Sequence, residues 1–173
     1  MAKYNFQDDV LPLKNELFRL ALRITLSQEE AEDVVQETMA KVWNKRETWN
    51  TIESMEAFCL TVCRNLALDR EKRKSLRERT LGFSAEADAA DTSYSADPEQ
   101  RTVDSDRMRL LKRLIDSLPE KQRSVMHLRD VEGKSYREIA SIMQITEEQV
   151  KVNLFRARQK IKKKFIETDS YGL

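Results

Sequence analysis

The last long segment of the sequence combines cationic and amide side chains of the types that could bind nucleic acid. Residues 149–166 hold seven lysines and arginines and no acid, whereas a helix that is merely exposed to solvent usually mixes both signs of charge. Apolar residues recur in this segment at spacings of four, three, four and four, which predicts one buried helical face. That face consists of Val150, Leu154, Ala157, Ile161 and Phe165.

The opposite face of the same predicted helix has the chemistry to read DNA. Its cations can pair with phosphates and guanine edges, and its amides can pair with adenine. The outward residues are Lys151, Asn153, Phe155, Arg156, Arg158, Gln159 and Lys162.

The residues just before this helix predict a helix-turn-helix. Ser135 and Glu138 form a capping box at the start of a short apolar helix, and Thr146 with Gln149 forms another at the start of the basic helix. A short helix, a turn at Gln144 and Ile145 and a basic second helix are typical of a motif whose second helix enters the DNA major groove. The alternative is a plain helical hairpin with a solvated basic face, and the lack of acids argues against it.

Charge is segregated along the whole chain, although the net charge is only +1. Residues 28–37 hold five acids and no base. Residues 64–80 hold seven bases against three acids, a net charge of +4, and residues 82–104 hold six acids against one base, a net charge of −5. Two basic segments separated by an acidic one indicate two contacts with a single polyanion.

Few helix breakers interrupt the chain, since its 173 residues include three glycines and three prolines. This composition predicts an all-α fold. Gly82 and Pro98 bracket a stretch rich in Ala, Ser and Asp that cannot bury enough apolar surface to fold by itself. We therefore expect two small helical domains, residues 1–81 and 105–173, joined by a flexible acidic linker at 82–104. Nothing in the sequence ties the domains together, so we expect them to be loosely arranged.

The N-terminal domain is predicted to be helical throughout. Ser27 and Glu30 form a capping box, and the helix that follows has an apolar stripe at three- and four-residue spacing. After a polar segment in which Trp49 has no obvious core to enter, a long helix runs from about Met55 to about Arg79. The predicted stripe consists of Ala31, Val34, Val35, Met39, Val42 and Trp43.

The sequence has no arrangement typical of an enzyme. Glu29, Asp33 and Glu37 share a helical face, but a carboxylate metal site in a bundle also needs paired Glu-x-x-His motifs. His127 is the only histidine, and no nucleophile–base set or glycine-rich phosphate loop is visible. We therefore expect no catalytic residue, no cofactor and no metal.

The chain is expected to be cytoplasmic, without membrane insertion. It has no run of about 18 apolar residues, and its start, MAKYNFQDDV, lacks the apolar core of a signal peptide. Cys59 and Cys63 are expected to be small buried side chains in a reducing compartment. His127 is expected to have a packing role, since it lies between Met126 and Leu128.

Both halves of the sequence resemble extracytoplasmic-function (ECF) RNA polymerase sigma factors of the sigma-70 family. The similar N-terminal blocks are AEDVVQETMAKVW (31–43) and MEAFCLTVCRNLALDREKR (55–73), and the C-terminal block is LPEKQRSVMHLRDVEGKSYREIASIMQITEEQVKVNLFRARQKI (118–161). The first block resembles the core-binding helix of sigma region 2, and the last resembles sigma region 4 with its helix-turn-helix. The resemblance implies an alternative sigma factor, which binds core polymerase, recognises −35 and −10 promoter elements and initiates transcription.

The resemblance implies specific roles in the N-terminal domain. Asp33, Gln36 and Glu37 match positions that grip the clamp helices of the largest polymerase subunit, and an acidic face suits a basic partner. Trp49 and Asn65 fall where the family holds a base flipped from the −10 element, by stacking and by an amide that donates and accepts. The alternative for Trp49 is that it folds back against the end of its helix. The cations implied at phosphates around the opened DNA are Arg64, Arg70, Arg73 and Lys74.

In the C-terminal domain the resemblance implies contact with duplex DNA at −35. The residues of this set are Lys151, Asn153, Phe155 and Arg156, with Arg158 on the same outward face. The chain departs from the family pattern at Val152 and Asn153, where many relatives carry Ser and Arg. The resemblance therefore implies the mode of binding but does not define the −35 sequence that is read.

The implied mechanism is a two-point clamp on promoter DNA. Duplex is bound at −35 while unpaired bases are captured at −10, so that DNA melting needs no ATP. The implied partners are core polymerase, through its clamp helices and flap, the promoter, and an anti-sigma factor; the acidic linker would occupy the RNA path. The rival interpretation is a free-standing helix-turn-helix regulator, which would bind duplex DNA without polymerase.

Overall fold

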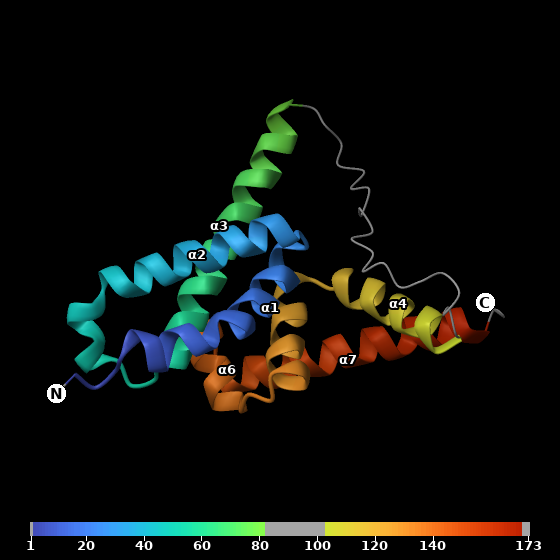
Figure 1. The fold of residues 1–173 in the computed structure, drawn as a ribbon. Coiled ribbons are helices and arrows are strands. Elements are labelled where there is room, and N and C mark those ends of the chain that lie inside the picture. The colour runs from blue at the N-terminus through green and yellow to red at the C-terminus, as the bar shows by residue number, and fades with distance from the viewer. Residues whose placement is uncertain (1, 82–102, 171–173) are drawn as a thin grey trace.

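The computed structural model describes residues 2–81 and 103–170, and all regular structure within those two ranges is helical (Figure 1). This confirms the all-α prediction. Residues 82–102, which make up most of the predicted linker, lie outside the described residues. The N-terminal unit contains η1 (Phe6–Val10), η2 (Leu11–Leu13), α1 (Lys14–Thr25), α2 (Gln28–Asn44), η3 (Arg46–Thr51) and α3 (Met55–Leu81). The C-terminal unit contains α4 (Val103–Asp116), α5 (Glu120–Met126), η5 (His127–Val131), α6 (Tyr136–Met143) and α7 (Glu147–Ser170).

The predicted capping residues begin three of these helices. At the start of α7, the Thr146 hydroxyl accepts from the backbone N–H of Gln149 at 3.1 Å, and the Gln149 side chain accepts from the N–H of Thr146 at 3.0 Å. The hydroxyl of Ser27 accepts from the backbone N–H of Glu30 at 3.3 Å. The hydroxyl of Ser135 accepts from the backbone N–H of Glu138 at 3.1 Å. These bonds satisfy N–H groups that have no partner inside the helix.

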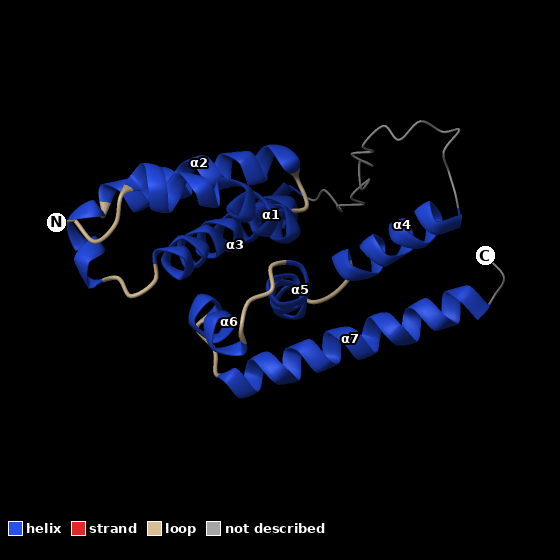
Figure 2. Cartoon of the chain, turned by 60° about the horizontal axis from the view of Figure 1, so that its bottom comes forward, coloured by secondary structure: helices blue, strands red, loops and turns tan. Residues whose placement is uncertain are grey.

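The N-terminal unit is a three-helix core in which α1, α2 and α3 pack on one another (Figure 2). Its fully buried side chains include Leu17, Leu20, Ile24, Val34 and Leu60. Cys59 and Cys63 are also buried, and both are free thiols. The apolar stripe predicted on α2 therefore faces this core, apart from the exception described below.

In the C-terminal unit, α4, α5 and α6 pack along the long helix α7. Val150, Leu154, Ala157 and Ile161 are buried as predicted, and Phe165 is half-buried. The turn between α6 and α7 is made by Gln144 in the left-handed region, with φ of 56°. This residue lets the chain reverse within the helix-turn-helix.

The two units pack against each other, which differs from the loose arrangement expected from the sequence. Helix α3 lies against α6, and α1 lies against α5 and η5. One continuous apolar core includes side chains of both units. The C-terminal side chains in this shared core are Val125, Leu128, Ile139, Ile142, Met143, Val150 and Leu154.

Ion pairs surround this shared apolar core. The guanidinium of Arg19 makes two bonds to Glu132, at 2.6 and 2.9 Å. The pairs that cross between the units are Arg19–Glu132, Arg23–Asp116 (3.0 Å), Arg64–Glu120 (3.1 Å), Lys134–Glu16 (2.8 Å) and Lys134–Glu56. These are single charges far apart in the chain, so no local pattern could have revealed their pairing.

His127 lies in this interface and is 3% exposed. Its Nε2 atom is 3.3 Å from Oε1 of Glu132, without the alignment of a hydrogen bond. Burial and the nearby guanidinium of Arg23 lower the pKa of His127 to about 4, although Glu132 opposes them and Arg19 adds to them. The imidazole is therefore neutral at pH 7 and has the packing role expected of it.

We predict that acid weakens the fold through His127. Histidine in an unfolded chain has a pKa of about 6.5. Between pH 6.5 and 4, His127 is therefore protonated in the unfolded chain but neutral in the folded chain. The contribution of neutral His127 to the free energy of unfolding is fully present above pH 6.5. It decreases as the pH is lowered further, by up to about 2 kcal/mol at pH 5. Urea unfolding at pH 7 and pH 5 measures the change. The His127→Gln variant should lose less stability between the two pH values, and an equal loss would contradict the assignment.

Candidate functional site

The outward face of α7 combines cations with large apolar side chains. Lys151 and Arg156 are exposed, and between them Val152 and Phe155 are 45% and 64% exposed. Residues 152 and 155 are three apart, so their side chains are neighbours on the helix. The predicted reading face is therefore open to solvent in the folded chain.

Several polar groups of this face already have partners within the protein. The amide of Asn153 donates to the carbonyl of Gln149 at 2.8 Å. Arg158 makes two bonds to Asp130, at 2.5 and 3.3 Å, and this hydrogen-bonded carboxylate raises the pKa of Arg158. The structure thus pairs Arg158 with η5, whereas Arg156 is exposed.

Lys151 also lies beside an aromatic ring of the neighbouring helix. Its ammonium is 5.8 Å from the ring centre of Tyr136, and the guanidinium of Arg129 is 4.7 Å from the same ring. The electron-rich faces of the ring attract both cations. Tyr136 therefore holds two positive charges close to the start of α7, the predicted reading helix.

The predicted core-binding residues form one exposed strip on α2. Asp33, Gln36 and Glu37 are all exposed. Arg70 of α3 lies 3.5 Å from Asp33 and 3.4 Å from Glu37. The structure thus brings a cation predicted to face DNA together with the acids predicted to face polymerase.

Arg64 and Asn65 are sequence neighbours with different surroundings. Asn65 is exposed, while Arg64 is 8% exposed and its Nη2 lies 3.1 Å from Oε2 of Glu120 on α5. Glu120 also accepts from the Ser124 hydroxyl at 2.7 Å. In this arrangement Arg64 faces a carboxylate of the C-terminal unit and not solvent.

The structure favours the fold-back alternative for Trp49 and contradicts the buried position predicted for Trp43. Trp49 is buried, 6% exposed, and its indole N–H donates to the carbonyl of Val42 at 3.0 Å. Trp43, which the periodicity placed in the buried stripe, is 45% exposed and lies edge-on to Trp49 and to Phe6. The short helix η3 folds Trp49 back beneath the end of α2, so it does have a core to enter. Its role at −10 remains a prediction.

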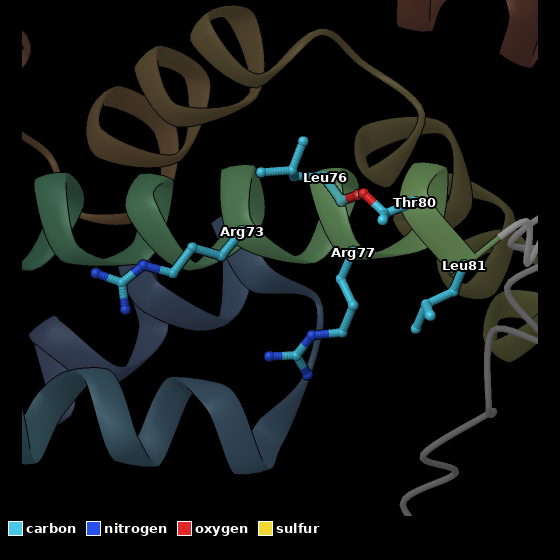
Figure 3. Close-up of a pocket in the computed structure, with 5 residues that line it drawn as sticks. All are labelled: Arg73, Leu76, Arg77, Thr80 and Leu81. Carbon is cyan, nitrogen blue, oxygen red and sulfur yellow. The ribbon is translucent and has the colours of Figure 1, made fainter.

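The last turns of α3 extend beyond the packed body of the N-terminal unit. Arg73 and Lys74 are exposed, as expected for residues that bind phosphates. Figure 3 shows Arg73 and Arg77 extending from one side of α3, with Leu76 on another. A shallow hollow there is lined by Arg73, Leu76, Arg77, Thr80 and Leu81.

The described residues show no metal-binding cluster of three or more His, Cys, Asp or Glu side chains. Cys59 and Cys63 are unreactive in this fold, because burial raises the pKa of each thiol to about 12. In the two described ranges, no helix is both long enough and apolar enough to span a membrane.

Sequence reasoning missed two features of these surfaces. The sequence marks Val152 only as a departure from the family pattern, whereas the structure shows that its side chain is exposed. A helical wheel would have put it beside Phe155, so a signal was present. The pairing of Arg64 with Glu120 had no such signal, since the two residues are 56 positions apart.

Comparison with known proteins agrees with the two-unit architecture. Residues 10–77 match the family model described as Sigma-70 region 2, and residues 108–161 match that described as Sigma-70, region 4. The ECF RNA polymerase sigma factor SigL of Mycobacterium tuberculosis is 35% identical over 147 residues, covering 82% of this chain and 77% of the relative. SigW of Bacillus subtilis is 26% identical over 168 residues, covering 91% and 87%.

Two further comparisons concern length and fold. SigE of Mycolicibacterium smegmatis is 30% identical over 148 residues, but the matched part is 86% of this chain and only 56% of that relative. The co-crystal structure of the sigma factor RpoE with the anti-sigma factor NepR from Bartonella quintana superimposes with a TM-score of 0.69 at 22% identity. It covers 95% of this chain and 98% of that chain, which supports the fold.

The helix-turn-helix and the two matched regions define a sigma-70-type transcription initiation factor. Within that class, the chain belongs to the ECF RNA polymerase sigma factors and is an alternative sigma factor.

We predict that Trp49 contributes to the stability of the N-terminal unit. Trp49→Phe removes a buried hydrogen bond and part of a packed ring, and should lower the free energy of unfolding by about 1–3 kcal/mol. The matched change at the exposed tryptophan, Trp43→Phe, should cost about 1 kcal/mol or less. Urea unfolding followed by circular dichroism measures both, and equal losses would contradict the buried role.

Proposed function

We propose that this sigma factor binds core RNA polymerase through α2 and contacts promoter DNA through α3 and α7. The observation that carries the proposal is that one chain presents an exposed acidic strip, Asp33, Gln36 and Glu37, and a separate basic reading face. A basic coiled coil such as the polymerase clamp helices complements the strip. The polymerase acts in the cytoplasm, which is therefore the proposed location.

At −35, the start of α7 enters the major groove of duplex DNA. Lys151 and Arg156 bind phosphates or guanine edges, and Val152 with Phe155 forms an apolar contact. The C5-methyl of thymine is the apolar group that the major groove offers. We therefore propose that thymine methyls lie against Val152 and Phe155 in the −35 element.

At −10, α3 supplies an exposed amide and cations to unpaired DNA. Asn65 reads a base edge, while Arg73 and Lys74 bind phosphates on the exposed part of the helix. Arg64 joins them only when it leaves Glu120. Trp49 requires a second rearrangement before it can stack on a base, because it is buried beneath α2.

An anti-sigma factor is the further proposed partner. One solved structure with the same fold is a complex of a sigma factor with an anti-sigma factor. We extend this kind of partner to the present chain.

The defining experiment is run-off transcription from a genomic fragment library. Core polymerase with the protein should produce discrete new start sites that share a pair of upstream elements, whereas core alone should not. Tight, specific binding of the free protein to duplex fragments, with no new starts, would favour the free-standing regulator instead.

We predict that the acidic strip determines affinity for core polymerase. Asp33→Ala/Glu37→Ala should weaken binding about tenfold by removing charge complementarity. Glu53→Ala/Glu138→Ala removes two exposed acids elsewhere and should leave the affinity unchanged. Fluorescence anisotropy with labelled protein measures both, and circular dichroism checks that the loss of the Arg70 pairs leaves the fold intact. Equal affinities for the two double variants would assign the interface to another surface.

We predict that the apolar pair on α7 makes transcription sensitive to thymine methyls. Replacing −35 thymine by deoxyuridine removes only the methyl group, and should reduce initiation by the wild type about five- to tenfold. The Val152→Ser/Phe155→Ala variant should respond little to that replacement. Ile166→Ser, which changes an exposed apolar residue at the far end of α7, should respond like the wild type. If initiation by the wild type is the same with thymine and with deoxyuridine, the proposed methyl contact is wrong.

A further inference from the structure

The first residues of the chain lie against the connection between α2 and α3. The Tyr4 hydroxyl donates to the main-chain carbonyl of Glu53 at 2.8 Å and lies 3.3 Å from that of Ile52. The ammonium of Lys3 donates to the same Ile52 carbonyl at 2.9 Å. Figure 1 shows the N-terminus beside this connection, although the two segments are far apart in the sequence. We call residues 3–6 the N-terminal strap.

The two carbonyls that the strap contacts need donors from outside the helices. Ile52 and Glu53 lie between the last residue of η3 and the first residue of α3. A main-chain carbonyl at such a point has no partner from a helical repeat, and leaving it unpaired away from water costs free energy. The strap supplies side-chain donors to both carbonyls. Because the acceptors are main-chain atoms, these bonds fix the path of the chain where it leaves η3.

The other end of η3 is held by Phe6. The centre of its ring is 5.4 Å from that of the Trp43 ring, and the two rings are edge-on at 77°. Trp43 lies in the last turn of α2, just before η3 begins. The strap therefore contacts the chain immediately before η3 and immediately after it.

Between these two contacts, η3 carries Trp49 into the core. A 3₁₀ helix has poorer hydrogen-bond geometry than an α-helix, so a six-residue one depends on contacts with its surroundings. Trp49 is 6% exposed, and its indole N–H donates to the carbonyl of Val42 at 3.0 Å. The strap bonds to the residues that flank η3 in this position, so its contacts also stabilise the buried position of Trp49. Removing them shifts the equilibrium toward a displaced η3.

We propose that Tyr4, with Lys3 and Phe6, is a positioning residue for −10 recognition that acts through Trp49. The strap holds η3 in the place that buries Trp49, and its release lets the indole stack on an unpaired base. The inference rests on the proposed function, because it needs Trp49 to contact −10 DNA. It adds that the start of the chain determines how readily Trp49 reaches that DNA. The strap precedes residues 10–77, the part similar to sigma region 2, so the resemblance does not imply this role.

Loss of the strap should tighten binding to single-stranded −10 DNA. Where only a fraction of a protein is competent to bind, the apparent Kd is the intrinsic Kd divided by that fraction. Lys3→Met/Tyr4→Phe removes both donors and keeps the aromatic ring, so it should raise the fraction of protein with Trp49 released. We expect the apparent Kd to fall about two- to tenfold.

Hydroxyl-radical labelling with mass spectrometry reports the position of Trp49 directly. Lys45 and Arg46 lie between the two tryptophans, so trypsin places them in separate peptides and each oxidation rate is measured in the same sample. The rate at Trp49 should be at least twofold higher in the strap variant, while the rate at the exposed Trp43 should stay the same. Tyr4→Phe alone, which keeps the Lys3 bond, should act in the same direction by a smaller factor.

A matched control removes the same groups elsewhere. Lys112→Met/Thr168→Val takes away an exposed ammonium and a hydroxyl that donates within α7, both in the C-terminal unit. Its Trp49 oxidation rate and its DNA affinity should equal those of the wild type. Circular dichroism and urea unfolding check that each variant is folded at the temperature of the assay.

DNA binding is measured with the complete complex of core polymerase and the protein. The probe is a labelled single-stranded oligonucleotide with the −10 sequence of a promoter mapped by run-off transcription. In a set of oligonucleotides, each base in turn is replaced by an abasic site. The gain in affinity of the strap variant should disappear at one position, because Trp49 then has no base to stack on. A merely structural role of the strap would change the affinity for every oligonucleotide by the same factor.

The outcomes separate this inference from the proposed function. Equal oxidation of Trp49 in the strap variant and the wild type would overturn the inference. Faster oxidation without tighter binding to the intact oligonucleotide would overturn it as well, provided that Trp49→Leu weakens that binding. If Trp49→Leu leaves the affinity of the complex for the oligonucleotide unchanged, the proposed role of Trp49 at −10 is itself wrong, whatever the strap does to its oxidation.

Discussion

The packing of α6 on both α3 and α7 joins the two units of this sigma factor. The apolar side of α6, with Ile139, Ile142 and Met143, belongs to a core shared by both units. The acidic strip of α2 and the predicted reading face of α7 both lie outside this shared core and are exposed. The groups proposed to bind polymerase and the −35 element are thus accessible in the packed chain, whereas Arg64 is buried.

Ion pairs within the chain use the same groups that the partners would use. Arg70 lies between Asp33 and Glu37, and Arg64 lies against Glu120. A charge that exchanges one counter-ion for another avoids most of the desolvation cost that an unpaired buried charge would carry. When a partner binds, each such group exchanges an ion pair within the chain for an ion pair with the partner. The binding free energy therefore includes only the difference between these two similar interactions.

The sequence was sufficient where the determining interactions are local. Capping residues such as Thr146 and Gln149 bond to the next turn, and the four-three-four spacing in α7 identifies its buried side without knowledge of other helices. It was insufficient where contacts join distant segments. Periodicity put Trp43 in the core, yet η3 brings Trp49 beneath α2 and leaves Trp43 outside. The pairing of the two units depends on single charges far apart, which no pattern within one helix reveals.

The contrast between the two tryptophans has a spectroscopic consequence. Trp49 is enclosed and hydrogen-bonded to Val42, so its emission should be blue-shifted and insensitive to quenchers in solution. Trp43 is exposed on α2, with the guanidinium of Arg46 4.7 Å from its ring centre, and its emission should be red-shifted and readily quenched. The chain thus contains an intrinsic fluorophore, Trp43, on the helix proposed to dock on polymerase.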